Sequence, residues 1–379
     1  MGRAKSVRAR AGKWLAISIV AAIIFIAGGI GIGKMLNASE IKQAHVFEFF
    51  PQGVVKAVWS PSGDRIAVLL TGGGAIHVFS KSGEELTKIN LNTDVGKPWA
   101  FEFLDADHLI MQKPSGFDGN SATLSIYNLS NRRFVSNPVE IVLPEILFVS
   151  KIVPDLSRNS IIVSGINADQ TLRGEMLAKY SYPDGKLIEK VQVESSIHGM
   201  KLINSGRILS TCGGDVLTKL DAIDLSREST FKFGASGVNF EADHCSFAAS
   251  PDGRYALVGA KTIMIGNAAH SVESEAAQQP KLFDLYSGRP VHDYRNTPTI
   301  YYNMDWSYVQ AVDWSQDGRY ALICDNSNDL TIIEVADLKT ARRLGKVADL
   351  TESISISPDG HSFLAATPSS VVIYDISPH

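Results

Sequence analysis

A short turn motif recurs along this chain and constrains its fold more than any other feature. Stretches of the Ser-Pro-Asp-Gly type occur at 60–63, 250–253, 315–318 and 357–360, each between two apolar runs of β-forming residues. Asp and Gly supply the side-chain hydrogen bonds and the positive φ that a tight turn needs. A recurring strand–turn–strand unit indicates a repeat architecture.

Weaker versions of the turn motif fill the 190 residues between Gly63 and Gly253, at 104–107, 154–159 and 204–207. Most intervals between successive turns are then 42 to 52 residues, which matches the roughly 40–50 residues of a four-stranded propeller blade. The one interval of 65 residues contains an insertion at 266–280. The spacing predicts an all-β fold, a seven-bladed β-propeller of four-stranded blades.

The two ends of the repeat array predict how the ring closes. The last repeat ends at His379 after its third strand, 371–376, and has no fourth strand. The run Ala44–Phe50 has no repeat of its own. We expect residues 44–50 to pair with the last repeat, because closure removes an exposed sheet edge.

These motifs resemble those of the WD-repeat and TolB-type family of β-propellers, and the resemblance covers residues 44–379. The closest stretch is Trp314–Ile323 followed by Leu330–Val335. The Gly-His pair and terminal Trp-Asp of WD repeats are absent. The resemblance implies a protein-interaction or scaffold role, with the loops that line the ring as the usual binding surface.

A membrane segment is predicted before the propeller. Residues 14–33 contain no charged residue, and about 20 such residues span the hydrocarbon core of a bilayer as a helix. A secretory signal peptide has a shorter apolar region of about 7–15 residues. We therefore expect an uncleaved transmembrane signal anchor at 14–36 rather than a cleaved signal peptide, with a linker at 37–43.

Five basic residues precede this segment, so the positive-inside rule keeps residues 1–13 in the cytoplasm. The expected location is the bacterial inner membrane, with the propeller in the periplasm. The alternative is the mitochondrial inner membrane facing the intermembrane space, because presequences are also Arg-rich and free of acidic residues. A small-residue face suggests that this helix packs against another helix; its members are Ser18, Ala22, Gly29 and Gly33.

The charge distribution argues against nucleic acid as a partner. Six of the 36 basic residues lie in 1–36, where no acidic residue occurs, so residues 37–379 carry 30 basic and 40 acidic side chains, a net charge of −10. Nucleic acids and anionic lipids attract basic surfaces. The expected partners are other protein subunits of a membrane complex.

Four long irregular segments are predicted to share one face of the propeller. They join second to third strands or successive blades, and they are 113–121, 167–175, 266–280 and 293–308. Functional residues concentrate on loops over a rigid scaffold. The last segment is rich in residue types that dominate interface hot spots, and its candidate partner-binding residues are Tyr294, Arg295, Tyr301, Tyr302, Trp306 and Tyr308.

Motifs for catalysis or metal binding do not occur in the sequence. It has no Gly-x-Ser-x-Gly, Walker loop, HExxH or Rossmann fingerprint, and no histidine pair at metal-ligand spacing. The stretch 325–329 lacks the Gly and distal Glu of a calcium loop and indicates a polar turn. The three cysteines, Cys212, Cys245 and Cys324, lie in apolar runs and are expected to be buried thiols. In an oxidising compartment, a disulfide between Cys212 and Cys245 is an alternative.

The sequence therefore favours a non-catalytic, membrane-anchored scaffold or assembly subunit without a cofactor or metal. Two alternatives stay open. One is the propeller subunit of a periplasmic redox enzyme similar to amine dehydrogenases, in which the cofactor chemistry lies on another chain. The other is a sensor that binds a small ligand in the central channel.

Overall fold

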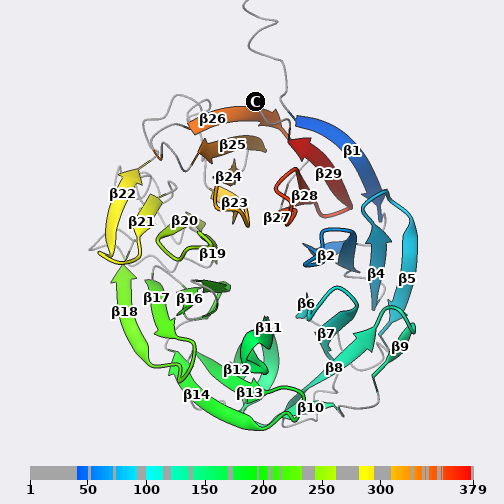
Figure 1. The fold of residues 1–379 in the computed structure, drawn as a ribbon, viewed down its shortest axis with the longest axis vertical. Helices are drawn as coiled ribbons and strands as arrows, with labels where there is room; N and C mark the ends of the chain where they lie inside the picture. The colour runs from blue at the N-terminus through cyan, green and yellow to red at the C-terminus, as the bar shows by residue number, and fades with distance from the viewer. Residues whose placement is uncertain are drawn as a thin grey trace, which may run out of the picture. The chain divides into compact units, whose positions relative to one another are not determined.

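The computed structural model of this chain is an all-β structure in which successive sheets are arranged in a ring (Figure 1). All described residues belong to one structural unit, Ile41–His379. The structure describes residues 41–49, 53–70, 74–91, 100–113, 121–135, 140–169, 174–193, 196–203, 206, 208–213, 216–232, 244–261, 281–293, 309–325, 328–334, 338, 341–347, 351 and 353–376.

The sheets radiate from a ring of first strands, which is the arrangement of a β-propeller. Each first strand contacts the first strand of the next sheet, and the last contacts the first. The first strands are β2 (Val54–Trp59), β6 (Phe101–Phe103), β11 (Ile146–Asp155), β15 (Gly199–Ile203), β19 (His244–Ala249), β23 (Val309–Trp314) and β27 (Ser353–Ile356). Each sheet is named below by its first strand.

Six of the sheets are four-stranded blades, antiparallel throughout and ordered outward from the centre. Their second and third strands are β3 (Arg65–Leu70) and β4 (Ala75–Ser80), β12 (Ser160–Asn167) and β13 (Glu175–Ser181), β16 (Ile208–Gly213) and β17 (Val216–Asp221), β20 (Tyr255–Lys261) and β21 (Lys281–Asp284), β24 (Tyr320–Asp325) and β25 (Asp329–Glu334), and β28 (Ser362–Ala366) and β29 (Ser370–Ile376). Their outer strands are β5 (Glu85–Asn90), β14 (Leu187–Val193), β18 (Arg227–Lys232), β22 (Arg289–Asp293), β26 (Ala341–Lys346) and β1 (Ile41–Glu48).

The β6 sheet has five strands, so the prediction of four strands in every blade is wrong here. Its second and third strands are β7 (His108–Gln112) and β8 (Ala122–Asn128). Two short strands, β9 (Arg133–Phe134) and β10 (Ile141–Leu143), share the outer edge of β8. The outer strand is split because the chain turns tightly at Arg132, where φ is +53°, pairs for only two residues and then returns at Ile141.

The closing strand β1 pairs antiparallel with β29 and joins the chain's start to its end (Figure 1). It covers Ile41–Glu48, whereas the sequence placed this strand at 44–50. Phe47 is buried and its ring lies 4.4 Å from that of Phe79, so β1 also packs against the β2 sheet.

The strong turn motifs join first to second strands, as their spacing predicts. In the β23 sheet the Ser315 Oγ donates to Asp317 Oδ1 at 2.8 Å and accepts from the Tyr320 N–H at 3.0 Å. The Gly318 N–H donates to the Ser315 carbonyl at 2.9 Å with φ at +74°, a conformation that suits glycine. The same bonds recur around Ser250 and Ser357.

The core lies between neighbouring sheets. Each apolar cluster joins two adjacent sheets, and together the clusters follow the ring from β2 to β27 and back. On the face that carries the turn motifs, hydrogen bonds also join neighbouring sheets. Arg65 reaches the Ala106 carbonyl at 2.9 Å, and Lys179 reaches the Ala222 carbonyl at 2.6 Å.

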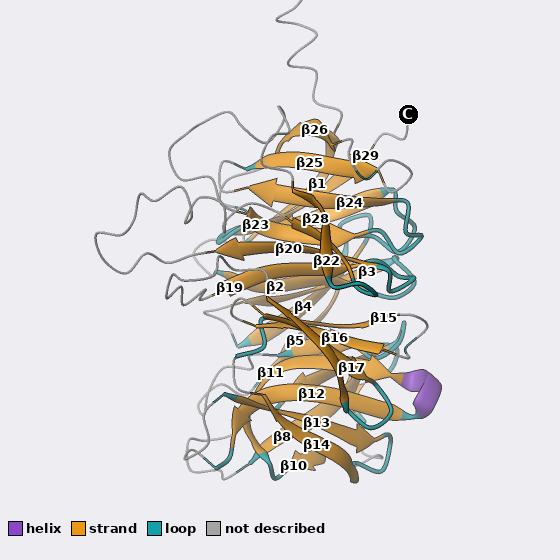
Figure 2. Ribbon diagram, turned by 90° about the vertical axis from the view of Figure 1, so that its left-hand side faces the viewer, coloured by secondary structure: helices purple, strands orange, loops and turns teal. Residues whose placement is uncertain are grey.

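The strand order places two kinds of connection on opposite faces, because consecutive strands are antiparallel. The turn motifs and the short 3-10 helix η2 (Leu156–Arg158) lie on the face where first strands end, at the right in Figure 2. Connections from second to third strands, and from each sheet to the next, start and end on the other face. Among the described residues, no helix is long and apolar enough to cross a membrane.

Candidate functional site

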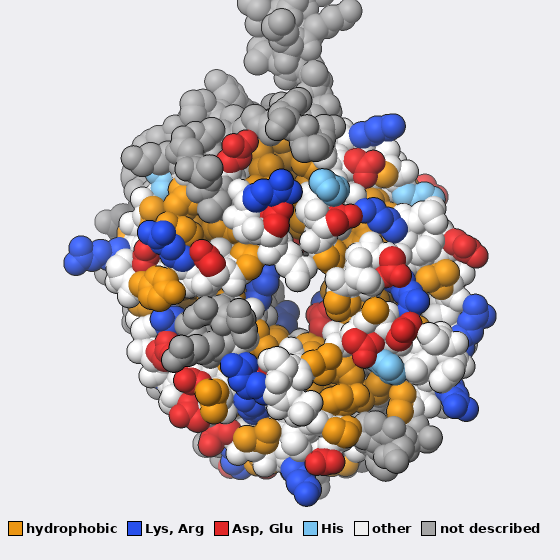
Figure 3. Space-filling view, in the orientation of Figure 1, with side chains coloured by type: hydrophobic (Ala, Val, Ile, Leu, Met, Phe, Trp, Pro, Cys, Tyr) orange, Lys and Arg blue, Asp and Glu red, His pale blue; other side chains and the backbone are white. Residues whose placement is uncertain are grey.

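Each first strand carries a partly buried polar residue, and together these residues form what we term the channel ring. Its members are Lys56, Glu102, Lys151, Lys201, Ser246, Asp313 and Ser355. In the space-filling view, basic and acidic side chains lie at the wall of the central opening (Figure 3). The innermost strand is the only one of each sheet that borders this opening, so polar side chains there retain access to water.

Strand alternation makes these residues face the next sheet in chain order. Lys56 lies opposite Leu69, which packs against the β6 sheet. Asp313 lies opposite Leu322, which packs against the β27 sheet. Residues directly opposite in an antiparallel pair lie on the same face of the sheet. The channel-ring side chains therefore converge at the inner ends of the inter-sheet interfaces.

β-Bulges interrupt three of the first strands and set the direction of the residues that follow. The register shifts between Val54 and Lys56 in β2, and between Val149 and Lys151 in β11. A third shift lies between Val309 and Ala311 in β23. Bulges twist a strand and re-aim its side chains, and they are frequent beside functional sites.

Lys56 and Glu102 form a fully partnered pair across two sheets. The Lys56 Nζ lies 2.9 Å from Glu102 Oε2 and donates to the Phe101 carbonyl at 2.8 Å. It also lies 5.1 Å from the centre of the Phe101 ring, a cation–π contact. This pair ties the β2 sheet to the β6 sheet.

Lys201 and Asp313 form a second contact, which spans the β19 sheet. Their charged atoms are 3.9 Å apart. The Asp313 carboxylate also accepts the Ile356 N–H at 2.6 Å and the Trp314 N–H at 2.8 Å. Burial raises the pKa of Asp313, and the charge of Lys201 opposes that rise.

Lys151 and Glu175 occupy the corner between the β11 and β15 sheets. The Glu175 side chain is buried, with 7% of its surface exposed, and its Oε1 accepts the Ser150 hydroxyl at 3.0 Å. The Ser164 hydroxyl and the Ile197 N–H also act on the Glu175 carboxylate, although Glu175 Oε2 and Ser164 Oγ form no hydrogen bond of normal geometry. Among the residues that the structure describes, Lys151 has neither a hydrogen bond nor an ion pair within 4.0 Å.

Burial is the main cause of the pKa shifts of Glu175 and Lys151. Burial raises the pKa of Glu175, and hydrogen bonds from Ser150, the Ile197 N–H and Ser164, together with the charge of Lys151, offset part of that rise. Desolvation, with a smaller contribution from the like charge of Lys56, lowers the pKa of Lys151 from its ordinary 10.5 to about 8. Glu175 and Glu102 act in the opposite direction. The Lys151 side chain is half-buried, and nearby protein atoms desolvate its ammonium group.

The channel ring gathers ammonium groups, carboxylates and hydroxyls from several strands. Side chains on strands are more accurately positioned than side chains on loops. In the described ranges, no group of three or more His, Cys, Asp or Glu side chains is arranged to hold a metal ion.

The residues singled out from the sequence as interface and helix-packing candidates lie outside the described residues. They are Tyr294, Arg295, Tyr301, Tyr302, Trp306 and Tyr308, and in the first segment Ser18, Ala22, Gly29 and Gly33. The strands that flank the aromatic segment, β22 and β23, place its two ends on the face opposite the turn motifs. The other three long segments also leave and re-enter on that face, between second and third strands.

The cysteines occupy three different sheets. Cys324 on β24 is a free thiol and fully buried, and burial raises its pKa, so the prediction of a buried thiol is confirmed there. Cys212 lies on β16 and Cys245 on β19, but their side chains fall outside the described part of the structure. The disulfide between them stays a prediction.

The stretch 325–329 begins with the end of β24 and forms a hydrogen-bonded turn. The Asn328 N–H donates to the Asp325 carbonyl at 3.0 Å, and Asn328 has a φ of +62°. The Asn328 Oδ1 accepts the Thr351 N–H at 3.1 Å. The polar groups of this stretch thus form hydrogen bonds within the turn and to Thr351, as expected of a polar turn.

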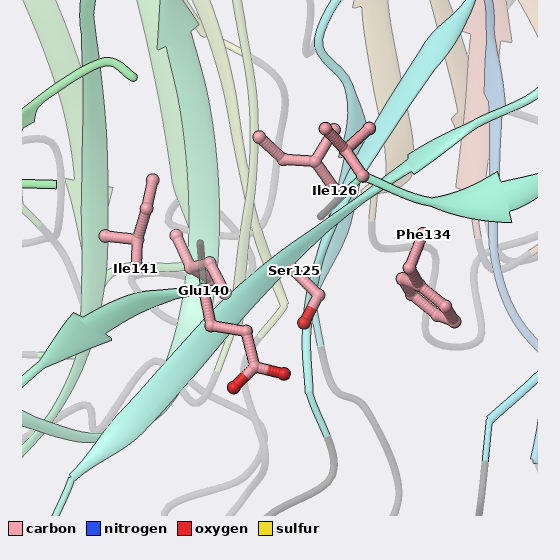
Figure 4. A pocket seen from close by; sticks show the side chains of 7 residues that line it. Ser125, Ile126, Phe134, Glu140 and Ile141 are labelled. Carbon is pink, nitrogen blue, oxygen red and sulfur yellow. The ribbon is translucent and has the colours of Figure 1, made fainter. Parts of the chain in front are cut away.

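A small pocket lies at the outer edge of the β6 sheet (Figure 4). Ser125 of β8 forms its floor, with Phe134 of β9 and Ile141 of β10 on either side. The pocket is the gap between the two short outer strands, which pair with different parts of β8. It is distant in the fold from the channel ring, because β8 is separated from the opening by β7 and β6.

The channel ring was not predicted from the sequence, although a signal for it exists. Isolated polar residues interrupt the apolar run before each turn, as in Val-Val-Lys-Ala-Val-Trp at 54–59 and Phe-Glu-Phe at 101–103. An isolated polar residue in a strand usually indicates a solvent-facing position. Only the radial packing of the sheets shows that these positions converge.

Comparison with known proteins adds no assignment: the chain matches neither a protein-family model nor a curated protein. The likeness to WD-repeat and TolB-type propellers thus stays a resemblance of the turn motifs. The fold and the candidate site rest on the strand pairing and side-chain contacts given above.

Proposed function

We propose that this chain is a non-catalytic, membrane-anchored β-propeller that serves as a scaffold or assembly subunit of a larger membrane protein complex. In this proposal the five-stranded β6 sheet counts as a seventh blade, because β6 lies between β2 and β11 in the ring of first strands. The relation to WD-repeat and TolB-type propellers, residues 14–36 as the anchor, and the periplasmic location are parts of the same proposal.

The observation that carries the proposal is the asymmetry of the two faces. On one face, short turns are held by buried serines and by hydrogen bonds between sheets. All four long segments start and end on the other face. A rigid scaffold with its long loops gathered on one face is typical of a protein-binding surface.

A pull-down from native membranes tests this proposal. The full chain, purified in mild detergent, is expected to retain its partner subunits, and the double substitution Tyr302→Ala, Trp306→Ala is expected to release them without lowering the melting temperature. Truncating aromatic anchors of this kind typically costs about 2 kcal/mol or more of binding free energy. Tyr286→Ala is the matched control, because Tyr286 is 66% exposed on the turn-motif face.

Partner subunits retained by the double variant would contradict the proposed binding surface. A redox cofactor that co-purifies and absorbs visible light would instead favour the propeller subunit of a redox enzyme. The two results are distinguishable because the first is read from the subunits and the second from the spectrum.

A further inference from the structure

Four large apolar side chains are exposed where the β11 and β15 sheets reach the turn-motif face, and we term them the apolar tips. They are Leu156 in η2, Leu187 and Ile188 at the start of β14, and Ile223 in the turn between β17 and β18. Figure 3 shows this face of the molecule, with apolar side chains among charged ones. Single exposed apolar side chains are common, but a group of them in one region indicates an interaction site.

The contacts of one lysine show that the apolar tips lie together at the boundary of the two sheets. The Lys179 Nζ donates to the Ala222 carbonyl at 2.6 Å, in the turn that carries one tip. It also lies 4.0 Å from the carboxylate of Asp155, the residue before η2. Glu189, directly opposite Lys179, follows the two tips on β14. All four tips are thus within a few residues of the same lysine or its partners.

Local hydrogen bonds hold two of the tips in water. The Asp221 Oδ1 accepts the Ile223 N–H at 2.6 Å, and Leu225 in the same turn is buried. In η2, the Leu156 carbonyl accepts the Asn159 N–H at 3.2 Å. Turning either exposed side chain inward would break these bonds. An apolar side chain that is held in water is stabilised when an apolar surface covers it.

The chain enters the propeller on this same face. Ile41, the first residue of β1, is directly opposite Ile376 at the end of β29. The Ile376 N–H donates at 2.9 Å to the carbonyl of His361, which follows a turn motif. Four residues, 37–40, separate Ile41 from the proposed anchor at 14–36, and a chain of that length reaches at most about 18 Å. In the proposed function, the entry edge of this face therefore lies near the bilayer.

We propose that the apolar tips insert into the surface of the lipid bilayer that the anchor spans, an inference that rests on the membrane-anchored function proposed above. The β11 and β15 sheets lie across the ring from the β27 sheet, which the chain enters first (Figure 1). The anchor and the tips then hold opposite sides of the turn-motif face at the membrane. Tethering raises the effective concentration of the tips at the bilayer to about the millimolar range, so a small apolar contact suffices.

The charges around the tips indicate a contact with neutral lipid. Arg158 and Lys186 are balanced by Asp184 and Asp224 on the same turns, and residues 37–379 carry a net charge of −10. Anionic lipid attracts clusters of basic residues. We therefore expect the tips to contact phosphatidylcholine, and added phosphatidylglycerol not to strengthen the contact. A strong increase with phosphatidylglycerol would overturn the inference, because charge rather than apolar insertion would then make the contact.

Photo-cross-linking of the full chain in phosphatidylcholine vesicles tests the docking. With a photoactivatable group on the lipid headgroup, the peptides that contain the apolar tips are expected to be labelled. The double substitution Leu156→Asp, Ile223→Asp is expected to lower labelling at 187–188 by about tenfold or more. Ile166→Asp is the matched control, because Ile166 is 47% exposed on the β11 sheet, compared with 57% for Ile223, but lies near the end of β12 on the opposite face.

Alkaline carbonate extraction of the same vesicles separates failure of the anchor from failure of the docking. A chain that carbonate strips from the vesicles would overturn the anchor, and the docking with it. A retained chain that is labelled as strongly at Ile166 as at Ile223 would overturn the docking alone, as would unchanged labelling of the double variant. Cross-links from the tips to a co-purified subunit instead of lipid would overturn it as well. Labelling of the unaltered chain needs no substitution, so it decides the question even if the double variant fails to fold.

Discussion

At the scale of single residues, most channel-ring residues have partners that stabilise the fold, whereas Lys151 lowers its stability. Lys56 and Asp313 each have several partners across a sheet boundary. Lys151 has none among the described residues, and its charge is enclosed by protein. A charge held without a partner costs stability, and functional sites are where proteins tolerate such costs.

Lys151→Met is therefore expected to raise the free energy of unfolding at pH 7, by ~2 kcal/mol after allowance for water in the channel. Between about pH 8 and about 10.5 the unfolded chain holds more protons at this residue than the folded protein. The destabilising effect of Lys151 should therefore decrease, and the free energy of unfolding of the unaltered protein should rise, as pH increases from about 8 to about 10.5. The advantage of Lys151→Met should shrink over the same range, which urea unfolding at several pH values would measure.

At the scale of the element, the turn between a first and second strand depends on one buried serine. Ser315 is fully buried, and its Oγ bonds both Asp317 and the Tyr320 N–H. Aspartate further stabilises the turn by accepting the Arg319 N–H at 3.0 Å. The motif is therefore a set of local hydrogen bonds, which is why it is readable from sequence.

Ser315→Ala is expected to lower the free energy of unfolding by about 1–3 kcal/mol, because it leaves the buried Tyr320 N–H without its acceptor. Thermal unfolding followed by circular dichroism would measure the loss. Ser369→Ala is the control, since the Ser369 side chain is exposed in a different turn. An equal change in both variants would show that the buried hydroxyl has no special role.

At the scale of the whole molecule, the ring is closed by pairing a strand from the start of the chain with one from its end. β1 pairs with β29 along Ile41–Glu48, and its Phe47 packs beside Phe79 of the β2 sheet. Each apolar cluster is shared by two neighbouring sheets, so opening one boundary weakens both of its sheets. Ring closure thus couples the stability of distant segments.

Phe47→Ala is expected to cost about 3–4 kcal/mol, because it leaves a cavity at the closing boundary. Lys42→Ala on the same strand removes an exposed side chain and should change stability by less than about 0.5 kcal/mol. Urea unfolding of both variants would compare them. If the two lost the same stability, β1 would not be a packed part of the ring.

The sequence alone determined the all-β repeat, the places of the turns and the pairing of the first strand with the last, because these depend on short-range hydrogen bonds and on the count of strands. It did not reveal the split outer strand of the β6 sheet, because two short strands there pair with different parts of β8. It also did not reveal the channel ring. Lys151, Ser164 and Glu175 are separated along the chain and look ordinary in it. Only the radial stacking of sheets and the register of β11, β12 and β13 bring them to one corner.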